Sequence, residues 1–546
     1  MTAMKHGHPT SHLSITSGAS HRLPAQQTTV RHLLRATGAC ILWGTVAIAA
    51  DQTAQPVSSA QSAEAVAQLI ALLKGQHIPD GEITLVERRD APTQEVGNNA
   101  PPLTHLPPRT IIKLVLTPAK GSHINVEAWL PDQDKWNGRF VGLGNGGAAG
   151  HIGPGGLAGQ VSAGYAAATT DMGTAPNADS GIGNKEVWKD FGFRATHLMT
   201  LAGKQLTTAF YGKAPDFSYF NGGSTGGQQA LQEAQRYPDD YDGIVAYIPA
   251  HCRTPLHAYF LWNEQILHAC PFTDAQQHNI IRAGNEFVAA KELPQTAGKM
   301  VSDPRCTAAD IAEVVARARA LDPTLTDAHA AAMTKLFDGP RHSVTGERIY
   351  NGVPFGSSFG PAHGNLYLFK WVFGATKDLQ TINFGADIDT YTAALAPYLN
   401  AENPDLDKFA AHGGKLIMLP GSADSVVPYH ASLDYYERVA ERLGSIDKAR
   451  AFIRLFIIPG MSHGPGPGLN HLPGGLQLLT DWREKGIAPD KLQCQRLIDG
   501  KTELDMPIYP YPQKTTWTKD GGFAPVDGPR GGVERIAERF RPAAAE

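Results

Sequence analysis

The sequence predicts an α/β fold, because short strand-like runs alternate with helix-like runs along much of the chain. From residue 164 to residue 250 these runs are, in order, GYAAATTDMG, FRATHLMTLAGKQLTTAFYG, DFSYFNGG, GGQQALQEAQRYP and YDGIVAYIPA. The first, third and fifth have the composition of strands, and the other two have apolar residues at helical spacing. Such alternation indicates a largely parallel sheet with helices on both faces.

The alternation is interrupted once and then resumes. Residues 251–405 carry the helical runs FTDAQQHNIIRAGNEFVAAKEL and AADIAEVVARARAL and then an aromatic, glycine-rich section. The runs GGKLIMLPG, ASLDYYERVAERLG, AFIRLFIIPG and GLQLLTDWREKG follow. We therefore predict a core formed by residues 51–250 and 406–546, with residues 251–405 as an inserted lid domain. The section after about residue 495, rich in Pro, Tyr and Gly, is expected to be irregular chain packed on the core.

Further core elements precede the alternation. SAEAVAQLIALLKG has helical spacing, with Ser62 as the expected N-cap and Gly75 as the stop. Four strand-like runs follow, EITLVERR, TIIKLVLTP, NVEAWLP and GRFVGLG, separated by Pro, Gly and Asn.

Residues 1–50 are predicted to be an N-terminal extension that ends in a secretory signal peptide. Arg31 and Arg35 precede a short apolar stretch, which ends in the small residues Ala47-Ile48-Ala49. The alternatives are an amphipathic first helix or a retained anchor. We expect a secreted or periplasmic protein, and no later segment is apolar over a length that would span a membrane.

Composition argues against several classes of function. The chain has 48 Lys+Arg against 52 Asp+Glu, a net charge of −4, which leaves no basic surplus for binding nucleic acid. Five Cys in 546 residues are too few for a disulfide scaffold. No CxxC or HExxH spacing indicates a metal site, so we interpret the 21 His as scattered surface residues.

The motif G-x-S-x-G occurs at residues 222–226, around Ser224. It also occurs around Ser358 and Ser462, but only Ser224 has a strand-like run before it and a helix-like run directly after it. A nucleophile at a sharp strand-to-helix turn requires this context. The alternatives for Ser224 are a plain glycine-rich turn or a phosphate cradle.

Two further residues complete a catalytic set in the chain order of an α/β-hydrolase. Asp424 follows the strand-like run KLIMLPG, and His463 follows AFIRLFIIP, so both lie where parallel strands end. In this arrangement His463 takes the proton of Ser224, Asp424 orients the imidazole, and Ser224 forms an acyl-enzyme. The predicted fold is therefore an α/β-hydrolase fold with a large inserted lid.

An oxyanion hole needs two N–H donors. The backbone of Thr225, directly after the nucleophile, is one expected donor. The glycine-rich run VGLGNGGAAG offers the second, from Gly146 or Gly147. A dinucleotide-binding turn is the alternative for this run, but no helix opens here and no acidic residue follows a second strand at the required distance.

At this point the chain resembles the tannase/feruloyl esterase family of α/β-hydrolases, which includes a bacterial hydrolase of the terephthalate monoester. The resemblance spans nearly the whole chain after the signal peptide. The matching segments are WNGRFVGLGNGGAAGHI, ATTDMGT, DFGFRATHLMT, FYGKAPDFSYFNGGSTGGQQALQEAQRYPDDYDGIVAYIPA, NPDLDKFAAHGGKLI, RLFIIPGMSHGPGPG and DWREKGIAPDKL. The resemblance implies an esterase for small-molecule esters of aromatic acids, and it assigns the catalytic roles to Ser224, Asp424 and His463.

The chain departs from this family at several positions. Family members usually have a disulfide between Cys residues next to the nucleophile and the histidine, where this chain has Gly223 and Gly464. We predict that these two loops still meet, with Cα atoms roughly 4.4–6.8 Å apart. The family calcium loop corresponds to FVAAKELPQTAGKMVSDP, which lacks a run of carboxylates, so neither a metal nor another cofactor is expected. Thr174 stands where the family commonly has His, and Tyr509 stands where it commonly has Cys.

The remaining cysteines and the lid aromatics give two last expectations. Cys40 leaves with the signal peptide, and a bridge between Cys252 and Cys270 is expected from their proximity in sequence. Cys306 and Cys494 lack their family partners. Lid aromatics could bind an aromatic acyl group, although packing is their commoner use. The aromatics in question are Phe355, Phe359, Phe369 and Trp371, with Tyr367 and Phe373 beside them.

The sequence therefore predicts a serine carboxylic-ester hydrolase. Two alternatives remain: an acyltransferase on the same fold, and a catalytically silent, hydrolase-like binding protein. The sequence does not choose between galloyl, feruloyl, phthalate-type and simple aliphatic esters.

Overall fold

The computed structural model describes residues 63–94, 102–292, 307–360, 366–464, 468–518, 520–528, 530 and 534–541. All of them belong to one compact unit, residues 38–546. The predicted signal peptide and Ser62 lie outside the described residues. None of the helices in the described ranges combines the length and hydrophobicity that a membrane crossing requires.

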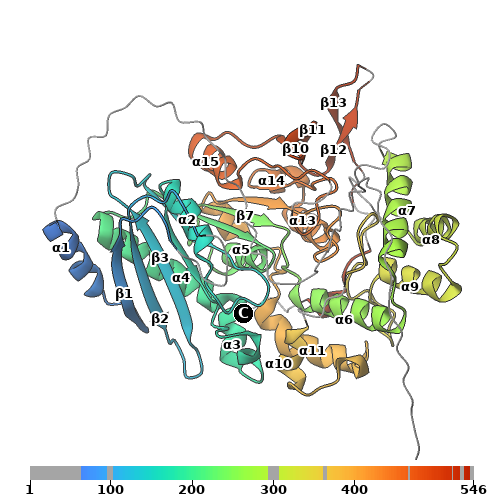
Figure 1. The fold of residues 1–546 in the computed structure, drawn as a ribbon, viewed down its shortest axis with the longest axis horizontal. Helices are drawn as coiled ribbons and strands as arrows, with labels where there is room; N and C mark the ends of the chain where they lie inside the picture. Colours follow the sequence, from blue (N-terminus) through green and yellow to red (C-terminus); the bar gives the residue numbers. More distant parts are fainter. Residues whose placement is uncertain are drawn as a thin grey trace, which may run out of the picture. The chain divides into compact units, whose positions relative to one another are not determined.

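A nine-stranded mixed sheet forms the centre of the core, in the order β1-β2-β3-β5-β4-β6-β7-β8-β9 (Figure 1). Its strands are β1 Gly81–Arg89, β2 Arg109–Leu116, β3 Ile124–Pro131, β4 Arg139–Leu143, β5 Ala166–Thr170, β6 Phe217–Gly223, β7 Gly243–Tyr247, β8 Lys415–Leu419 and β9 Ile453–Leu455. From β5 to β9 in spatial order every pairing is parallel. Strands β1, β2, β3 and β5 pair antiparallel, so this end of the sheet is not parallel.

Helices cover both faces of this sheet. They are α1 Ala63–Lys74, α2 Pro154–Ser162, α4 Ala195–Tyr211, α5 Thr225–Arg236, α13 His430–Leu443, α14 Ile446–Arg450 and α15 Gly475–Lys485. Because side chains alternate along a strand, Phe140 packs in one hydrophobic core with α4, α5 and α13, whereas Val141 packs in another with α2 and α15. The parallel part of the sheet is therefore buried on both sides, as the apolar strand sequences predict.

The chain leaves the sheet after β7 and returns at β8, although these two strands are neighbours, with Val245 opposite Ile417. The helices in between are α6 Arg253–Ala269, α7 Asp274–Glu292, α8 Ala308–Leu321, α9 Asp327–Asp338, α10 Tyr367–Phe373, α11 Ala386–Leu399 and α12 Asp407–Ala411. Most of these helices share one hydrophobic core, which also takes in Met172 and Phe191 from outside the insertion. Helices α7, α8 and α9 lie side by side (Figure 1). The exact lid boundaries, 251 and 405, stay a prediction.

Shorter helical turns connect these elements. They are η1 Ala178–Gly181, α3 Lys185–Lys189, the π-helical η2 Asp190–Arg194, η5 Leu379–Thr381 and η6 Glu538–Phe540.

The expectation of irregular chain after residue 495 is wrong. Strands β10 Leu492–Ile498 and β11 Lys501–Ile508 form one hairpin, and β12 Gln513–Trp517 and β13 Phe523–Asp527 form another. Asp499 and Gly500 connect the first pair, both with positive φ, of 50° and 75°. An Asp-Gly pair is a strong signal for a two-residue hairpin turn, so the sequence did contain the evidence.

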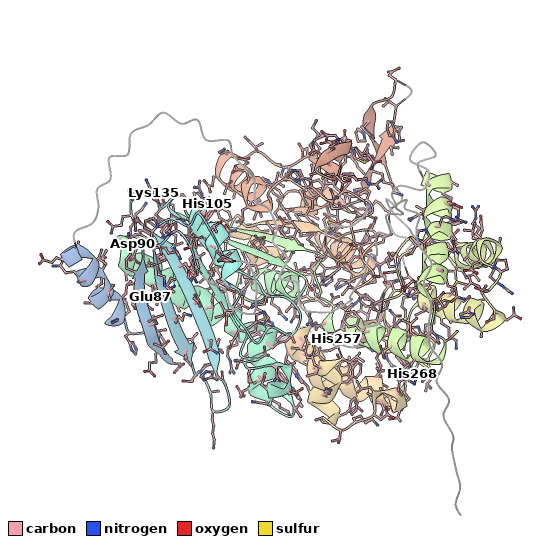
Figure 2. The ribbon with its side chains drawn as sticks, in the orientation of Figure 1. Glu87, Asp90, His105, Lys135, His257 and His268 are labelled. Carbon is pink, nitrogen blue, oxygen red and sulfur yellow. The ribbon has the colours of Figure 1, made fainter. Side chains whose placement is uncertain are left out.

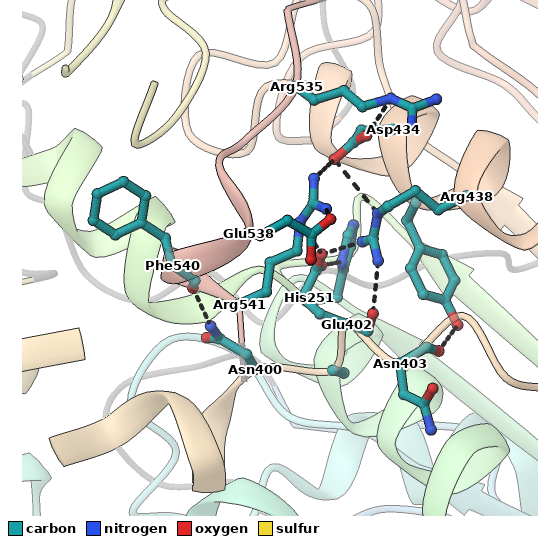
Figure 3. Close-up of polar contacts among 12 residues, drawn as sticks. His251, Asn400, Glu402, Asn403, Asp434, Arg438, Arg535, Glu538, Phe540 and Arg541 are labelled. Carbon is teal, nitrogen blue, oxygen red and sulfur yellow. Dashed lines mark hydrogen bonds and ion pairs between the residues drawn. The ribbon is translucent and has the colours of Figure 1, made fainter. Parts of the chain in front are cut away.

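A buried ionic cluster joins the C-terminal segment to the rest of the fold (Figure 3). This Glu402 cluster consists of His251, Glu402, Asp434, Arg438 and Arg541. The Glu402 carboxylate contacts both His251 and Arg438, and the Asp434 carboxylate accepts a 2.8 Å hydrogen bond from Arg541. The Glu402 cluster therefore connects the turn after β7, the segment before β8, helix α13 and the last described residues.

Candidate active site

Ser224 lies at the sharp turn between β6 and α5. Its backbone has φ 59° and ψ −116°, a conformation that a non-glycine residue rarely adopts. The turn is held because the Ser224 carbonyl accepts hydrogen bonds from Gly227, Gln228 and Ala250 N–H groups, at 2.9, 3.2 and 3.0 Å. The side chain is thereby presented at the N-terminus of α5, whose dipole favours negative charge.

The glycines of the motif are required by close backbone approach. A Cβ on Gly222 would lie 2.3 Å from the Gly226 carbonyl oxygen. A Cβ on Gly226 would in turn lie 3.1 Å from the backbone of Gly144, on the loop after β4. The motif therefore lets this loop lie directly against the turn that carries Ser224.

Asp424 and His463 come from the loops after β8 and β9. His463 Nε2 lies 3.0 Å from Ser224 Oγ, and His463 Nδ1 lies 2.8 Å from Asp424 Oδ2. The two loops are tied together, since Gly460 N–H donates to Ser422 Oγ at 2.9 Å. The structure thus brings together the three residues that the sequence singled out, in hydrogen-bonded order.

The carboxylate of Asp424 has a fixed orientation. The residue is fully buried, and its Oδ1 accepts hydrogen bonds from the Val426 and Val427 N–H groups, each at 2.8 Å. Its other oxygen is therefore left for His463. The His463 side chain is 24% exposed, so the imidazole connects a buried acid to a serine within reach of solvent.

The loop after β4 carries the glycines predicted for the oxyanion hole. Gly146 and Gly147 are exposed, and their N–H groups donate to no acceptor in the described part of the chain. Asn145 anchors the loop, because its carbonyl accepts the Gly226 N–H at 2.7 Å. Thr225 is the first residue of α5, so its N–H has no intrahelical acceptor.

Sequence reasoning missed Arg253, which lies beside this loop. Its guanidinium donates to Thr225 Oγ1 at 2.9 Å and to the Gly147 carbonyl at 3.1 Å. It also donates to the hydroxyl of Tyr367, on lid helix α10. Arg253 follows β7 as Asp424 follows β8, so the rule that polar residues at the carboxyl ends of strands form the site could have found it.

The four lid aromatics proposed for substrate contact have no exposed face, which contradicts that expectation. Phe355, Phe359, Phe369 and Trp371 are 0%, 2%, 0% and 1% exposed. Phe355 and Phe359 pack against Phe337, Phe369 stacks on Tyr391 at 4.3 Å, and Trp371 donates to the Ala178 carbonyl. These side chains form the lid core instead.

The expected bridge between Cys252 and Cys270 is also wrong. Both thiols are free, and the two residues flank opposite ends of α6, a 17-residue helix about 25 Å long. Proximity in sequence failed as a guide because the intervening residues are helical. Cys494 is free and buried, and Cys306 lies outside the described residues.

Metal-capable residues come together at one place in the described ranges. Potential ligand atoms of His197, Glu233 and Asp240 lie within 4.8 Å of one another. Burial and the nearby Asp240 raise the pKa of Glu233 well above its usual value, and Lys204 lies beside the pair. His197 Nδ1 also lies 2.7 Å from the Asp240 carboxylate, so these side chains contact one another directly. Residues 293–304, most of the segment compared with the family calcium loop, lie outside the described residues.

The sequence suggested that the histidines are scattered surface residues, but some of them are buried. His105 and His268 are exposed, whereas His257, on the same helix as His268, is 1% exposed (Figure 2). His251 is fully buried in the Glu402 cluster. His257 and His251 are buried by contacts between distant segments, which the sequence alone does not reveal.

Comparison with known proteins gives a consistent result. The family model described as tannase and feruloyl esterase matches residues 111–385 and 372–528. A probable feruloyl esterase B of Aspergillus niger is 30% identical over 433 residues, covering 74% of this chain and 82% of that protein. An uncharacterized esterase of Xanthomonas campestris is 29% identical over 487 residues, covering 76% and 84%.

Solved structures agree with these relatives. Feruloyl esterase B from Aspergillus oryzae superposes with a TM-score of 0.73 at 26% identity, covering 84% of this chain and all of that one. A tannin acyl hydrolase from Aspergillus niger shares the fold, with a TM-score of 0.71 at 20% identity over 88% of this chain and 98% of that one. The chain belongs to the tannase and feruloyl esterase family, and it is a carboxylic ester hydrolase with an α/β-hydrolase fold.

Proposed function

We propose that Ser224, His463 and Asp424 form a catalytic triad that hydrolyses esters through an acyl-enzyme. The observation that carries this proposal is the continuous chain of contacts, 3.0 Å from Ser224 Oγ to His463 Nε2 and 2.8 Å from His463 Nδ1 to Asp424. Each distance is within hydrogen-bond range, so the proton can pass from the hydroxyl to the imidazole without rearrangement.

The reaction runs in two halves. His463 Nε2 takes the Ser224 proton as Oγ bonds to the ester carbonyl carbon, and the same proton then passes to the departing alcohol as the ester C–O bond breaks. Water attacks the acyl-enzyme by the same path, which releases the acid and restores Ser224. Asp424 stays ionised and stabilises the imidazolium in both halves.

The oxyanion of each tetrahedral intermediate is bound by backbone N–H groups. Thr225 supplies one, and Gly146 or Gly147 supplies the other. Support comes from the placement of both donors: Thr225 opens α5, and the glycines lie on the loop that packs against the nucleophile turn through Gly144 and Gly226.

The substrates are esters of aromatic acids, of the hydroxybenzoic, hydroxycinnamic or phthalic type. The names of similar proteins support this proposal. The Aspergillus niger relative is a probable feruloyl esterase B, the Aspergillus oryzae structure is that of a feruloyl esterase B, and the second similar structure is that of a tannin acyl hydrolase.

A panel of small esters tests both statements. Purified protein is assayed on gallate, hydroxycinnamate, phthalate-type and aliphatic esters of the same alcohol, together with Ser224→Ala. We expect faster hydrolysis of an aromatic class and a fall to the background rate in the variant, by about 10⁵- to 10⁶-fold. Ser358→Ala is the matched control, since Ser358 is exposed in the lid and has the same motif. Full activity of Ser224→Ala would refute the triad.

We also propose that the protein is exported and works without a metal ion. N-terminal sequencing of the protein from culture medium or periplasm is expected to begin just after the Ala47-Ile48-Ala49 segment. Treatment with EDTA is expected to leave both activity and thermal stability unchanged. A loss that calcium restores would contradict the second expectation.

A further inference from the structure

Arg253 is a buried cation beside the proposed oxyanion hole. The residue opens helix α6 directly after β7 and is 3% exposed. Among the described residues, no carboxylate oxygen lies within 4.0 Å of its guanidinium, which instead lies 5.3 Å from the Phe191 ring centroid. Burying a charge without a counter-ion costs free energy, so the hydrogen bonds around the guanidinium must compensate for it.

The neighbours converge on the carbonyl of Gly147. This oxygen accepts hydrogen bonds from Thr225 Oγ1 at 2.6 Å, Arg253 Nη2 at 3.1 Å and the Tyr367 hydroxyl at 3.3 Å. Arg253 Nη1 also donates to Thr225 Oγ1. The guanidinium thus connects the two segments that are proposed to supply the oxyanion donors.

This loop needs an external constraint. Gly147 has a positive φ of 57°, and Cβ atoms on Gly146 and Gly147 would meet nothing within 4 Å. Neither side chains nor close packing therefore restrict these two residues, and glycine has the widest backbone freedom. Hydrogen bonds to the Gly147 carbonyl fix the peptide plane that follows Gly147. The backbone of Gly147, and with it the direction of its N–H, is therefore less free to rotate.

We propose that Arg253 is a positioning residue that preorganises the oxyanion hole. Its hydrogen bonds hold the Gly147 carbonyl against Thr225, so that N–H groups of both segments face the same point before substrate arrives. Its buried positive charge, unpaired by any described carboxylate, favours the negative charge that develops in the tetrahedral transition state. This inference rests on the proposed function of Ser224.

The same contacts couple the oxyanion loop to the lid. Tyr367 comes from α10, and its ring packs edge-on against His257 of α6, with centroids 5.2 Å apart. Arg253 and His257 lie one turn apart on α6. Helices α6 and α10 of the insertion therefore hold the guanidinium in place, and the lid contributes to catalysis without contacting the reacting atoms.

Substitution of Arg253 tests the proposal through the split between kcat and KM. For Arg253→Gln we expect kcat to fall about 10- to 100-fold, while KM changes less than threefold, because the lost interaction acts on the transition state. Arg253→Lys keeps the charge without the forked donor geometry and should recover only part of kcat. Arg109→Gln is the matched control, since Arg109 is another fully buried arginine that contacts carbonyls and an aromatic ring, far along the sheet in β2.

Chemical rescue separates positioning from mere stability. Free guanidinium is expected to raise the kcat of Arg253→Ala at least fivefold at concentrations that leave Arg109→Ala and wild type unchanged, and ammonium at equal ionic strength should not. Wild-type kcat in folded Arg253→Gln would overturn the proposal, as would equal rescue by ammonium.

If the Arg253 variants fail to fold, Tyr367→Phe and Thr225→Val test the same contacts. We expect kcat to fall in both variants, and wild-type kcat in both would overturn the proposal.

A parallel assay of Ser224→Ala keeps the two proposals apart. Activity in Ser224→Ala refutes the triad, whatever Arg253 does. An inactive Ser224→Ala together with an unimpaired Arg253→Gln refutes only the positioning role.

Discussion

Gly144 and Gly226 approach so closely that a Cβ on Gly144 would lie 2.5 Å from the Gly226 Cα. The contact joins the loop after β4 to the first turn of α5, and the proposed oxyanion donors lie on either side of it. A side chain at Gly144 would therefore push the loop after β4 away from the first turn of α5.

Gly144→Ala should therefore impair catalysis more than stability of the whole fold, because its Cβ would lie 2.5 Å from the Gly226 Cα and one of the two segments must shift. A shift of about 1 Å between catalytic groups costs on the order of 100-fold, so kcat/KM should fall by at least that factor. Steady-state kinetics and a thermal melt measure the two effects. Gly159→Ala is the control: its Cβ would meet nothing within 4 Å and lies in helix α2, so this change should raise stability by up to about 1 kcal/mol.

Asp424→Asn should lower kcat by about 10⁴-fold while the fold is kept. Oδ1 of Asp424 faces two backbone N–H groups, so the amide oxygen is expected to take that position. The amide NH₂ would then face His463 Nδ1 and stabilise the wrong tautomer. Burst kinetics with an activated ester would show slow acylation, whereas rapid acylation would contradict the role of Asp424.

Gly223→Cys combined with Gly464→Cys should form a disulfide between the two active-site loops. The residues adjoin Ser224 and His463, which are hydrogen bonded, and Gly464 has open space for a side chain. At Gly223 a Cβ would make an ordinary 3.4 Å contact with Tyr247. We expect about 2–4 kcal/mol of added stability that reductant abolishes. Thiol titration against each single variant provides the measurement, and two persistently free thiols would show that the loops do not meet as predicted.

Glu402→Gln should destabilise the protein by about 3–5 kcal/mol, because it removes the carboxylate nearest to the buried Arg438 guanidinium and leaves only Asp434, 3.7 Å away. Burial alone would raise the pKa of Glu402, but Arg438, His251 and Arg541 outweigh burial and lower it from 4.5 to about 2. The ionised group therefore contributes its full stability above pH 4.5 and loses that contribution as the pH falls toward 2.

The stability difference between wild type and Glu402→Gln should accordingly narrow as the pH falls below 4.5. Urea unfolding at pH 6, 5, 4 and 3.5 measures it. Glu441→Gln provides the control, because Glu441 is 51% exposed and its ion pair with Arg535 should contribute under about 1 kcal/mol. A constant difference across this pH range would be inconsistent with the lowered pKa of Glu402.

The elements that could be predicted are those with strong local patterns. Helix α8 occupies 308–321, exactly the predicted run, because Thr307 and Asp310 form a capping box at its start. The strands of the parallel sheet are apolar runs bounded by Gly and Pro, so they too could be located. The Asp499-Gly500 turn is an equally local signal for a hairpin, whereas the Pro, Tyr and Gly content of the surrounding section indicates only irregular chain.

Contacts between distant segments could not be predicted in this way. Cys252 and Cys270 are close in sequence but separated by a helix, whereas Ser224 and His463 are distant in sequence but hydrogen bonded. The antiparallel end of the sheet, the burial of Phe355 and Trp371 in the lid core and the buried Glu402 cluster likewise depend on how elements pack.

The sequence by itself determined the α/β fold class and the three residues proposed for catalysis, because the position of a residue at the end of a parallel strand is a local property with a spatial consequence. Only the tertiary structure decided that Arg253 and Tyr367 converge on Gly147 from an insertion more than a hundred residues away in sequence. The direction of a buried guanidinium depends on every element packed around it, and no single segment of the sequence encodes that arrangement.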